Sequence, residues 1–353
     1  MRLSIDIEKR LGNFMLRSAF EVDTETFALL GASGCGKTMT LKCIAGIEKP
    51  DRGRIILGDR ILFDSGKRIN VPARDRHVGY LFQNYALFPN MTVKKNISCV
   101  AQDRAYAEEL MRRFCIDTVA GQYPSELSGG QSQRTALARM LVTKPEVLLL
   151  DEPFSALDNY MRTRMEHEIL DILEEFKGPS ILVTHDRNEA YRLASRIGVM
   201  EAGGIVEIQE RQEFFDHPET VAAARLTGCK NISKIKKTEE GSWFAEDWGF
   251  GIMVPEEQNM EGISHAGYRA HYFTCINEEE DAPEALECRL QRVIEDTFSV
   301  AVCFTIEGNR SESPDALLTW VVDKKEWEEE KEQILSGAFR LGYDPDKIMY
   351  LSL

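Results

Sequence analysis

A glycine-rich segment has the residue types that bind phosphate. Residues 31–38 read Gly-Ala-Ser-Gly-Cys-Gly-Lys-Thr and fit G-x-x-x-x-G-K-[ST]. An apolar run precedes the segment and a helical pattern follows it, so we expect strand, loop and helix in that order. Backbone N–H groups and the helix N-terminus would then face a phosphate. The predicted phosphate-binding residues are Gly31, Ala32, Ser33, Gly34, Cys35, Gly36, Lys37 and Thr38.

Within this loop, two side chains have predicted roles of their own. Lys37 can reach the β- and γ-phosphates of a nucleotide, and Thr38 can bind Mg²⁺. A chance glycine-rich turn is the alternative, and the strand–loop–helix context argues against it.

Two adjacent carboxylates follow an apolar run further along the chain. Residues 147–150 read Val-Leu-Leu-Leu, and Asp151 and Glu152 come directly after them. Ligands of an open α/β sheet bind at the carboxyl ends of its strands. We therefore predict that Asp151 holds Mg²⁺ through its water shell and that Glu152 polarises the attacking water. Taken alone, the pair could also be an ordinary strand end.

A second candidate anion site begins at Ser128. This residue is a good N-cap, and Gly129 and Gly130 leave backbone N–H groups accessible before Gln131 and an Ala/Leu-rich helix. An ordinary capped helix is the alternative. One nucleotide does not obviously need two such sites in one chain, and the residues alone leave this question open.

The elements that position these residues alternate between strand and helix. Short apolar runs at 27–30, 147–150, 181–183 and 197–200 are typical of strands buried on both faces, and residues 162–177 form an amphipathic helical pattern. Residues 51–82 read as further strands, and residues 103–145 as helices with breaks. This order predicts a mainly parallel sheet of the α/β class.

Charge divides the chain into two parts. It has 353 residues and a net charge of −15, of which residues 229–353 contribute −13 from 26 acidic and 13 basic side chains. We expect domains at 1–228 and 229–353. In the second, residues 286–294 and 300–306 alternate like strands and residues 323–335 form a Glu-rich helix, which predicts a small β-rich domain.

Composition excludes several classes of protein. No run of 18 apolar residues is present, and the first eight residues lack the apolar core of a signal peptide. An acidic chain is a poor candidate for nucleic-acid binding, so no nucleic-acid partner is expected. The eight cysteines form no C-x-x-C pair, and we expect reduced thiols rather than a zinc site.

Together these motifs closely resemble the ATP-binding subunit of ABC transporters. Residues 127–131 resemble the family's signature motif, Gln83 its Q-loop glutamine, residues 155–158 its D-loop and His185 its switch histidine. The resemblance covers residues 1 to about 228. It implies a P-loop NTPase (ABC ATPase) fold with a helical subdomain, ATP and Mg²⁺ as cofactors, and an ATP hydrolase coupled to transport.

The resemblance also implies partners. Two subunits would form a head-to-tail homodimer, in which Ser128, Gly129 and Gly130 contact the γ-phosphate of ATP bound by the partner. Gln131 and Asp158, of the same motifs, are further candidate ATP-binding residues. Such a subunit lies on the cytoplasmic face of the membrane with permease subunits, and a solute-binding protein acts indirectly from the other side.

It assigns roles to two further side chains as well. His185 would hold the γ-phosphate, and Gln83 would sense Mg²⁺ and water. Gln83 would link the Mg²⁺ ion and the attacking water to the permease through residues 84–91. Exposed Tyr85, Leu87 and Phe88 there would suit a partner helix, unless they belong to the core of the helical subdomain.

The finer resemblance is to one group of importers. Residues 62–65 and 71–78 resemble ATPases of the molybdate, sulfate and iron group, and residues 228–231 are most similar to its molybdate/tungstate branch. There, the C-terminal domain is of the oligomer-binding type and in some members binds the oxyanion and stops transport. The alternatives are a dimerisation or docking domain, a sulfate, iron or sugar cargo, and a soluble non-transport ABC ATPase.

One departure from the family concerns adenine. The family usually stacks the base on an aromatic residue well before the phosphate loop, but residues 8–13 contain none. Phe14 follows them and is close to the phosphate loop in sequence. The base-stacking residue is therefore either Phe14 or another aromatic residue.

Overall fold

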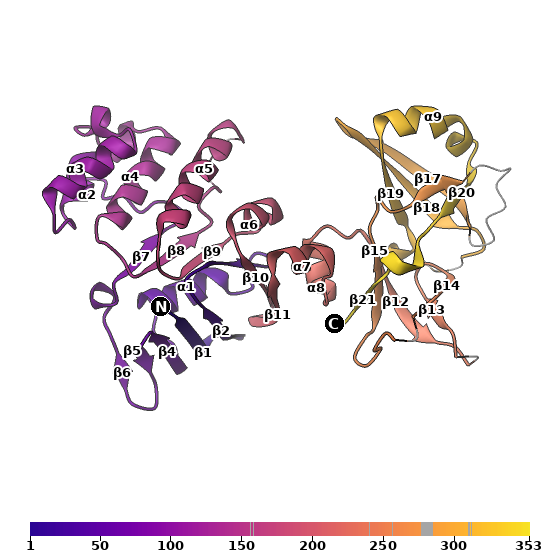
Figure 1. Cartoon of the computed structure of the whole chain (residues 1–353), viewed down its shortest axis with the longest axis horizontal. Helices are drawn as coiled ribbons and strands as arrows, with labels where there is room; N and C mark the ends of the chain where they lie inside the picture. The colour runs from indigo at the N-terminus through magenta and orange to yellow at the C-terminus, as the bar shows by residue number, and fades with distance from the viewer. Residues whose placement is uncertain are drawn as a thin grey trace. The chain divides into compact units, whose positions relative to one another are not determined.

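The computed structural model describes residues 1–155, 157, 159–239, 241–255, 257–276, 285–309, 311 and 313–353. Contacts divide the chain into two compact units, Met1–Arg211 and Gln212–Leu353, each of which is described by itself (Figure 1). This division falls earlier than the boundary expected at residue 228. The reason is packing, because Val221 and Ala224 of α8 (Val221–Leu226) share a small apolar cluster with Ile232 and Leu351.

The first unit is built on an eleven-stranded sheet. Its parallel part holds strands β10, β3, β9, β8 and β7 in that spatial order. Their bounds are β3 (Thr26–Leu30), β7 (Val78–Leu81), β8 (Val147–Asp151), β9 (Ser180–Val183) and β10 (Arg196–Glu201). Every residue of β3, β8 and β9 is buried, which confirms the predicted α/β class.

Antiparallel strands extend the sheet past β10 and hold the N-terminus. They are β1 (Leu3–Leu11), β2 (Phe14–Val22), β4 (Arg52–Leu57), β5 (Arg60–Asp64), β6 (Ile69–Asn70) and β11 (Gly204–Glu210). Within this part, β1 pairs with both β2 and β4. β11 pairs in parallel with β2 at one position, which joins the two parts into one sheet.

Helices cover both faces of the parallel part. Val147 and Leu149 of β8 share a core with Leu41 and Ile44 of α1 (Lys37–Ala45). Their neighbours Leu148 and Leu150 belong to a second core. Since successive side chains of a strand point to opposite faces, α1 and the elements of the second core lie on opposite sides of the sheet. The second core includes Met165 and Ile169 of α5 (Asn159–Glu175).

The helical region expected at 103–145 is several short elements. α2 (Val93–Ser98), α3 (Arg104–Arg113) and α4 (Gly129–Leu141) share the second core, and Figure 1 shows them clustered beside β7 and β8. Three-residue helical turns at Asp117–Val119 and Pro124–Glu126 separate α3 from α4. α6 (Arg187–Leu193) follows β9.

The second unit is β-rich, as predicted. Two five-stranded sheets enclose a core that includes Trp248, Phe304 and Trp320. One sheet holds β12 (Asn231–Lys237), β13 (Trp243–Ala245), β14 (Phe250–Ile252), β15 (His265–Tyr268) and β21 (Met349–Leu351). The other holds β16 (Thr274–Ile276), β17 (Leu286–Glu295), β18 (Ser299–Ile306), β19 (Leu318–Asp323) and β20 (Ala338–Gly342).

Helices of this unit lie before its first strand and between β19 and β20 along the chain. α9 (Lys324–Leu335) confirms the predicted Glu-rich helix, with Asp323 as its N-cap. α7 (Arg211–Asp216) and α8 precede the first strand. None of the helices described here, in either unit, is long and apolar enough to cross a membrane.

Candidate nucleotide-binding and hydrolysis site

The glycine-rich loop connects β3 to α1, as the sequence predicts. Gly36 is the N-cap of α1 and has φ 115°, in the left-handed region that favours glycine. A Cβ atom there would lie 2.7 Å from Leu16 Cδ1, so a larger residue would displace the loop. The loop therefore brings its backbone close to both β2 and the helix start.

Lys37 folds back over this loop. Its side chain is buried, and the ammonium donates to the carbonyl oxygens of Gly31 at 2.7 Å and Ala32 at 3.0 Å. Cys35 Sγ lies 3.7 Å from the same nitrogen. The charge of Lys37 is thus held at the loop by weak neutral acceptors, which phosphate oxygens can replace.

Asp151 is held by two hydroxyl groups. Thr38 Oγ1 donates to Asp151 Oδ1 and Tyr80 Oη donates to Oδ2, each at 2.8 Å. Burial raises the pKa of Asp151 above its usual value, while the two hydrogen bonds act in the opposite direction. Burial and the neighbouring carboxylate raise the pKa of Tyr80, so its hydroxyl remains a donor. Tyr80 was not among the residues predicted from the sequence, because its place beside Asp151 depends on the pairing of β7 with β8.

The oxygen pair of Thr38 and Asp151 fits a Mg²⁺ site. Mg²⁺ in nucleotide sites is bound through one or two carboxylates together with phosphate oxygens and water, rather than by a full cage of side chains. Among the described residues, no cluster of three or more His, Cys, Asp or Glu side chains is suited to a metal.

Glu152 lies at the meeting point of three strand ends. Gln83, which follows β7, donates from Nε2 to Glu152 Oε2 at 3.0 Å. Nδ1 of His185, which follows β9, lies 3.4 Å from Glu152 Oε1. Glu152 itself has φ 45°, a left-handed conformation that costs a non-glycine residue about 1 kcal/mol or more. The backbone is therefore held in a strained turn that aims this carboxylate.

The candidate signature residues cap α4. Ser128 Oγ accepts from the Gln131 N–H at 3.3 Å, and Gln131 Oε1 accepts from the Ser128 N–H at 2.9 Å. In the described part of the chain, no hydrogen bond joins residues 128–131 to the phosphate-binding loop. The structure thus brings together Lys37, Thr38, Gln83, Asp151, Glu152 and His185, and it leaves the Ser128 site apart. Asp158 lies outside the described residues.

Phe14 lies beside the phosphate-binding loop. Its ring is half-buried against Leu16, Cys35 and Met200, and its Cζ is 3.5 Å from the position a Cβ atom would take on Gly36. Residues 8–13 contain no aromatic side chain, but Phe14, the first residue of β2, places one at the phosphate-binding loop.

Residues 84–91 differ in part from expectation. The prediction that Tyr85 is exposed was wrong, because its ring is buried with the core of the helical subdomain and Leu87 packs against the same core. Phe88 is 43% exposed, and the Arg139 guanidinium lies 5.0 Å from the centre of its ring. Tyr85 and Ala86 have positive φ angles of 61° and 44°, which mark a sharp turn.

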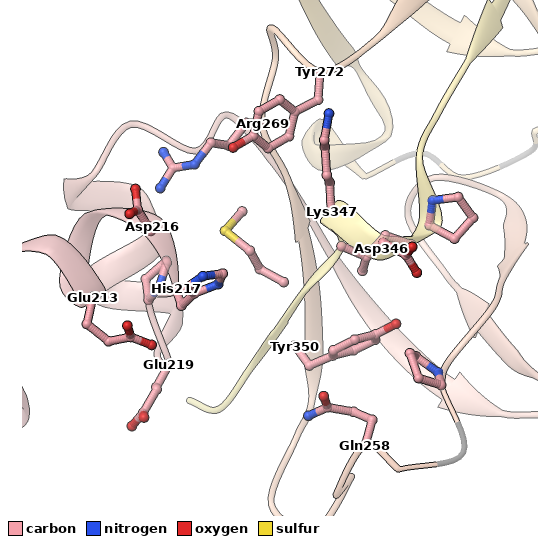
Figure 2. Close-up of a pocket in the computed structure, with 15 residues that line it drawn as sticks. Glu213, Asp216, His217, Glu219, Gln258, Arg269, Tyr272, Asp346, Lys347 and Tyr350 are labelled. Carbon is pink, nitrogen blue, oxygen red and sulfur yellow. The ribbon is translucent and has the colours of Figure 1, made fainter.

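The second unit has a cavity of about 400 Å³ (Figure 2). Its charged lining residues are Arg269, Lys347, Glu213, Asp216, Glu219 and Asp346, with His217 beside them. The Arg269 guanidinium donates to the carbonyl oxygens of Thr227, at 3.3 Å, and Phe215. The Lys347 ammonium lies 4.9 Å from the centre of the Tyr272 ring. Both cations are engaged within the protein, and the carboxylates outnumber them.

Comparison with known proteins identifies the family of the chain. A family model described as ABC transporter matches residues 20–155. The putrescine transport ATP-binding protein of Escherichia coli (strain K12) is 43% identical over 226 residues, which cover 61% of this chain and 58% of that protein. The sulfate/thiosulfate import ATP-binding protein of Caulobacter vibrioides is 35% identical over 321 residues, 87% of this chain and 90% of that one.

A solved structure shares the fold. It is the dimeric ATP-binding cassette MJ0796 in a post-hydrolysis state bound to ADP and Pi, with a TM-score of 0.51 and 25% identity over 60% of this chain and 99% of that chain. A phosphate-binding loop between a parallel strand and a helix, with carboxylates at the neighbouring strand end, defines a nucleotide-binding class of fold. The chain belongs to the ABC transporter family, among the ATP-binding subunits of import systems.

Proposed function

We propose that this chain hydrolyses ATP and powers an importer. The observation that carries the proposal is the position of Glu152, whose carboxylate is held by Gln83 and lies beside His185 at the strand end next to Asp151. A carboxylate in that position can accept a proton from water as the water attacks the γ-phosphate. The match to the putrescine relative spans 58% of that protein.

The residues of the loop bind the nucleotide. Lys37 would exchange its bonds to Gly31 and Ala32 for bonds to the β- and γ-phosphates. Thr38 and Asp151 would hold Mg²⁺, which supplies charge neutralisation on the phosphates when bound. Phe14 is the best-placed ring for contact with the base.

The second anion site is explained by a dimer. Ser128, Gly129, Gly130 and Gln131 begin α4 without a bond to the chain's own phosphate loop, as expected if they act on the nucleotide of a partner. The solved relative MJ0796 is dimeric, which supports a head-to-tail homodimer. His185 would hold the γ-phosphate from its own subunit.

A permease is the partner that residues 84–91 would contact. Exposed Phe88, supported by Arg139, and the sharp turn at Tyr85 and Ala86 present this segment directly after Gln83. The chain would then lie on the cytoplasmic face of the membrane, and a solute-binding protein would act through the permease. The relatives named above are transport subunits, which favours this function over a non-transport ABC ATPase.

Molybdate or tungstate is the cargo that we propose. Support comes from the resemblance of residues 62–65, 71–78 and 228–231 to that branch. Sulfate and putrescine, which appear in the names of relatives, are the alternatives. The cavity in the second unit does not favour a regulatory oxyanion site there, because Arg269 and Lys347 are already engaged and carboxylates predominate.

Reconstitution tests the cargo. In a complex with permease and binding protein, molybdate or tungstate should raise ATP turnover, whereas sulfate and putrescine should not. The isolated chain should turn over ATP at a basal rate that molybdate leaves unchanged, since the cargo acts only through the partners. Stimulation by sulfate or putrescine alone would refute the molybdate assignment and retain the ATPase.

A further inference from the structure

Gln133 connects the start of α4 to the catalytic turn. It lies one turn into the helix that Ser128 caps, and its side chain is fully buried. Its Nε2 donates to the carbonyl oxygen of Pro153 at 3.0 Å. Pro153 is the residue directly after Glu152, so a single side chain joins the candidate signature helix to the peptide that follows the catalytic carboxylate.

The stability of the core alone does not explain this glutamine. A carbonyl oxygen only accepts, so the amide nitrogen must face Pro153 and the amide oxygen must face away. That oxygen, Gln133 Oε1, is buried and has no hydrogen-bond partner among the described residues. An unpaired buried acceptor costs about 1–3 kcal/mol, whereas an apolar side chain of similar size would fill the space without that penalty.

The helix that carries Gln133 is firmly held. Arg134, the next residue, makes a two-point contact with Glu168 of α5, with Nε donating at 3.0 Å and Nη2 at 2.5 Å. A Cβ atom on Gly130 would lie 2.3 Å from Met161 Cε, so the start of α4 packs directly against the Met161 side chain of α5. A displacement at the N-terminus of α4 is therefore carried along the helix to Gln133 rather than absorbed locally.

The turn that receives the bond is also held by β9 and by hydrogen bonds of its own. Glu152 is in a left-handed conformation, and its N–H donates to Val183 O at 2.9 Å. Ser155 Oγ donates to Glu152 O at 3.0 Å. Of these contacts, the hydrogen bond from Gln133 to Pro153 O comes from α4. It fixes the orientation of the Pro153 carbonyl, directly after the strained Glu152.

We propose that Gln133 is a positioning residue that makes the placement of Glu152 depend on the N-terminus of α4. This inference rests on the proposed function. When Ser128 contacts the nucleotide bound on the partner's loop, the contact adjusts Glu152 of the same chain, which acts on the nucleotide bound at that chain's own loop. Gln133 itself does not contact substrate, and it acts through the Pro153 carbonyl.

The first test separates turnover from binding. Gln133→Met keeps the size of the side chain and removes the donor, so kcat should fall about tenfold to a hundredfold, as expected for a misplaced catalytic group. The Kd for ATP at the chain's own loop should stay within about twofold of wild type. Thr135→Val is the matched control, since it removes a buried hydroxyl bond on the same helix, from Oγ1 to Gln131 O at 2.7 Å, that does not reach the turn.

The second test uses pH. Gln133→Glu can donate to Pro153 O only when its carboxyl is protonated, and burial favours that form. Its kcat relative to wild type should therefore rise severalfold between about pH 8.5 and about pH 6, while the ratio for Gln133→Met stays flat. Thermal unfolding of Gln133→Glu at both pH values shows whether ionisation of the buried carboxyl merely destabilises the fold. If Gln133→Met fails to fold, the comparison is with wild type alone, and a flat ratio for a folded Gln133→Glu overturns the inference.

The outcomes distinguish this inference from the proposed function. Wild-type kcat in Gln133→Met, a parallel loss of kcat and ATP affinity, or equal pH profiles for the two variants would overturn it. Glu152→Gln is assayed alongside. An inactive Glu152→Gln with a fully active Gln133→Met refutes the role of Gln133 alone, and an active Glu152→Gln refutes the proposed function.

Discussion

At the residue scale, Tyr80 extends the predicted site by one hydroxyl. Tyr80→Phe removes its bond to Asp151 Oδ2 and leaves the carboxylate held by Thr38 alone. A hydrogen bond to a charged group contributes about 1.5–3 kcal/mol, so we expect the Mg²⁺ concentration for half-maximal activity to rise about tenfold. Mn²⁺ binding to the ATP-loaded protein, followed by electron paramagnetic resonance, should weaken in parallel.

A control for this variant is available in the same segment. Tyr85 is also buried, and its hydroxyl has no hydrogen-bond partner among the described residues. Tyr85→Phe should leave metal dependence unchanged. If Tyr80→Phe binds Mn²⁺ as tightly as wild type does, the hydroxyl plays no part in holding Asp151.

At the element scale, Arg76 holds the helix that follows the phosphate loop. Its side chain is fully buried, and Nη1 donates to Cys43 O and Ile44 O, each at 2.8 Å, at the end of α1. Nε donates to Val71 O at 2.8 Å. Burial lowers the pKa of Arg76, and the carbonyls of a helix C-terminus favour the cation.

Removing that cation should destabilise the first unit. Arg76→Met leaves several buried carbonyl oxygens without a hydrogen-bond donor. We expect the free energy of unfolding to fall by on the order of 3 kcal/mol, seen by calorimetry as a lower transition temperature. Arg74→Met is the control, because the Arg74 side chain is 85% exposed and pairs with its neighbour Asp75. Equal transition temperatures for the two variants would contradict a role for Arg76 in securing α1.

Elements also differ in how far the sequence predicted them. The central strands were predictable because parallel strands buried on both faces are almost continuously apolar, as β8 is at residues 147–150, before Asp151. The region at 103–145 was harder, because its breaks depend on local turns such as Asp117–Val119. The motif residues were predictable from spacing, whereas Tyr80 and Gln133 required the pairing of β7 with β8 and the packing of α4.

At the scale of the whole molecule, the proposed dimer predicts complementation. Ser128→Arg should bind ATP at its own loop and fail to hydrolyse it as a homodimer, because the partner's γ-phosphate meets a bulky cation. Lys37→Ala should also be inactive, since it removes the loop cation. In an equal mixture, half of the dimers would carry one intact composite site, so activity should return to about a quarter of wild type. A mixture as inactive as its components would argue that the sites are not shared, or that one site cannot work alone.

The central claim is that Glu152 accepts the proton of the attacking water, and Glu152→Gln tests it most directly. ATP turnover should fall by at least about a hundredfold while ATP binding is retained, because the phosphate-binding surfaces are intact. With ATP and Mg²⁺, size-exclusion chromatography should show the variant accumulating as a dimer, whereas Glu175→Gln, a change at a largely exposed carboxylate, should behave as wild type does. Wild-type turnover by Glu152→Gln would contradict the account.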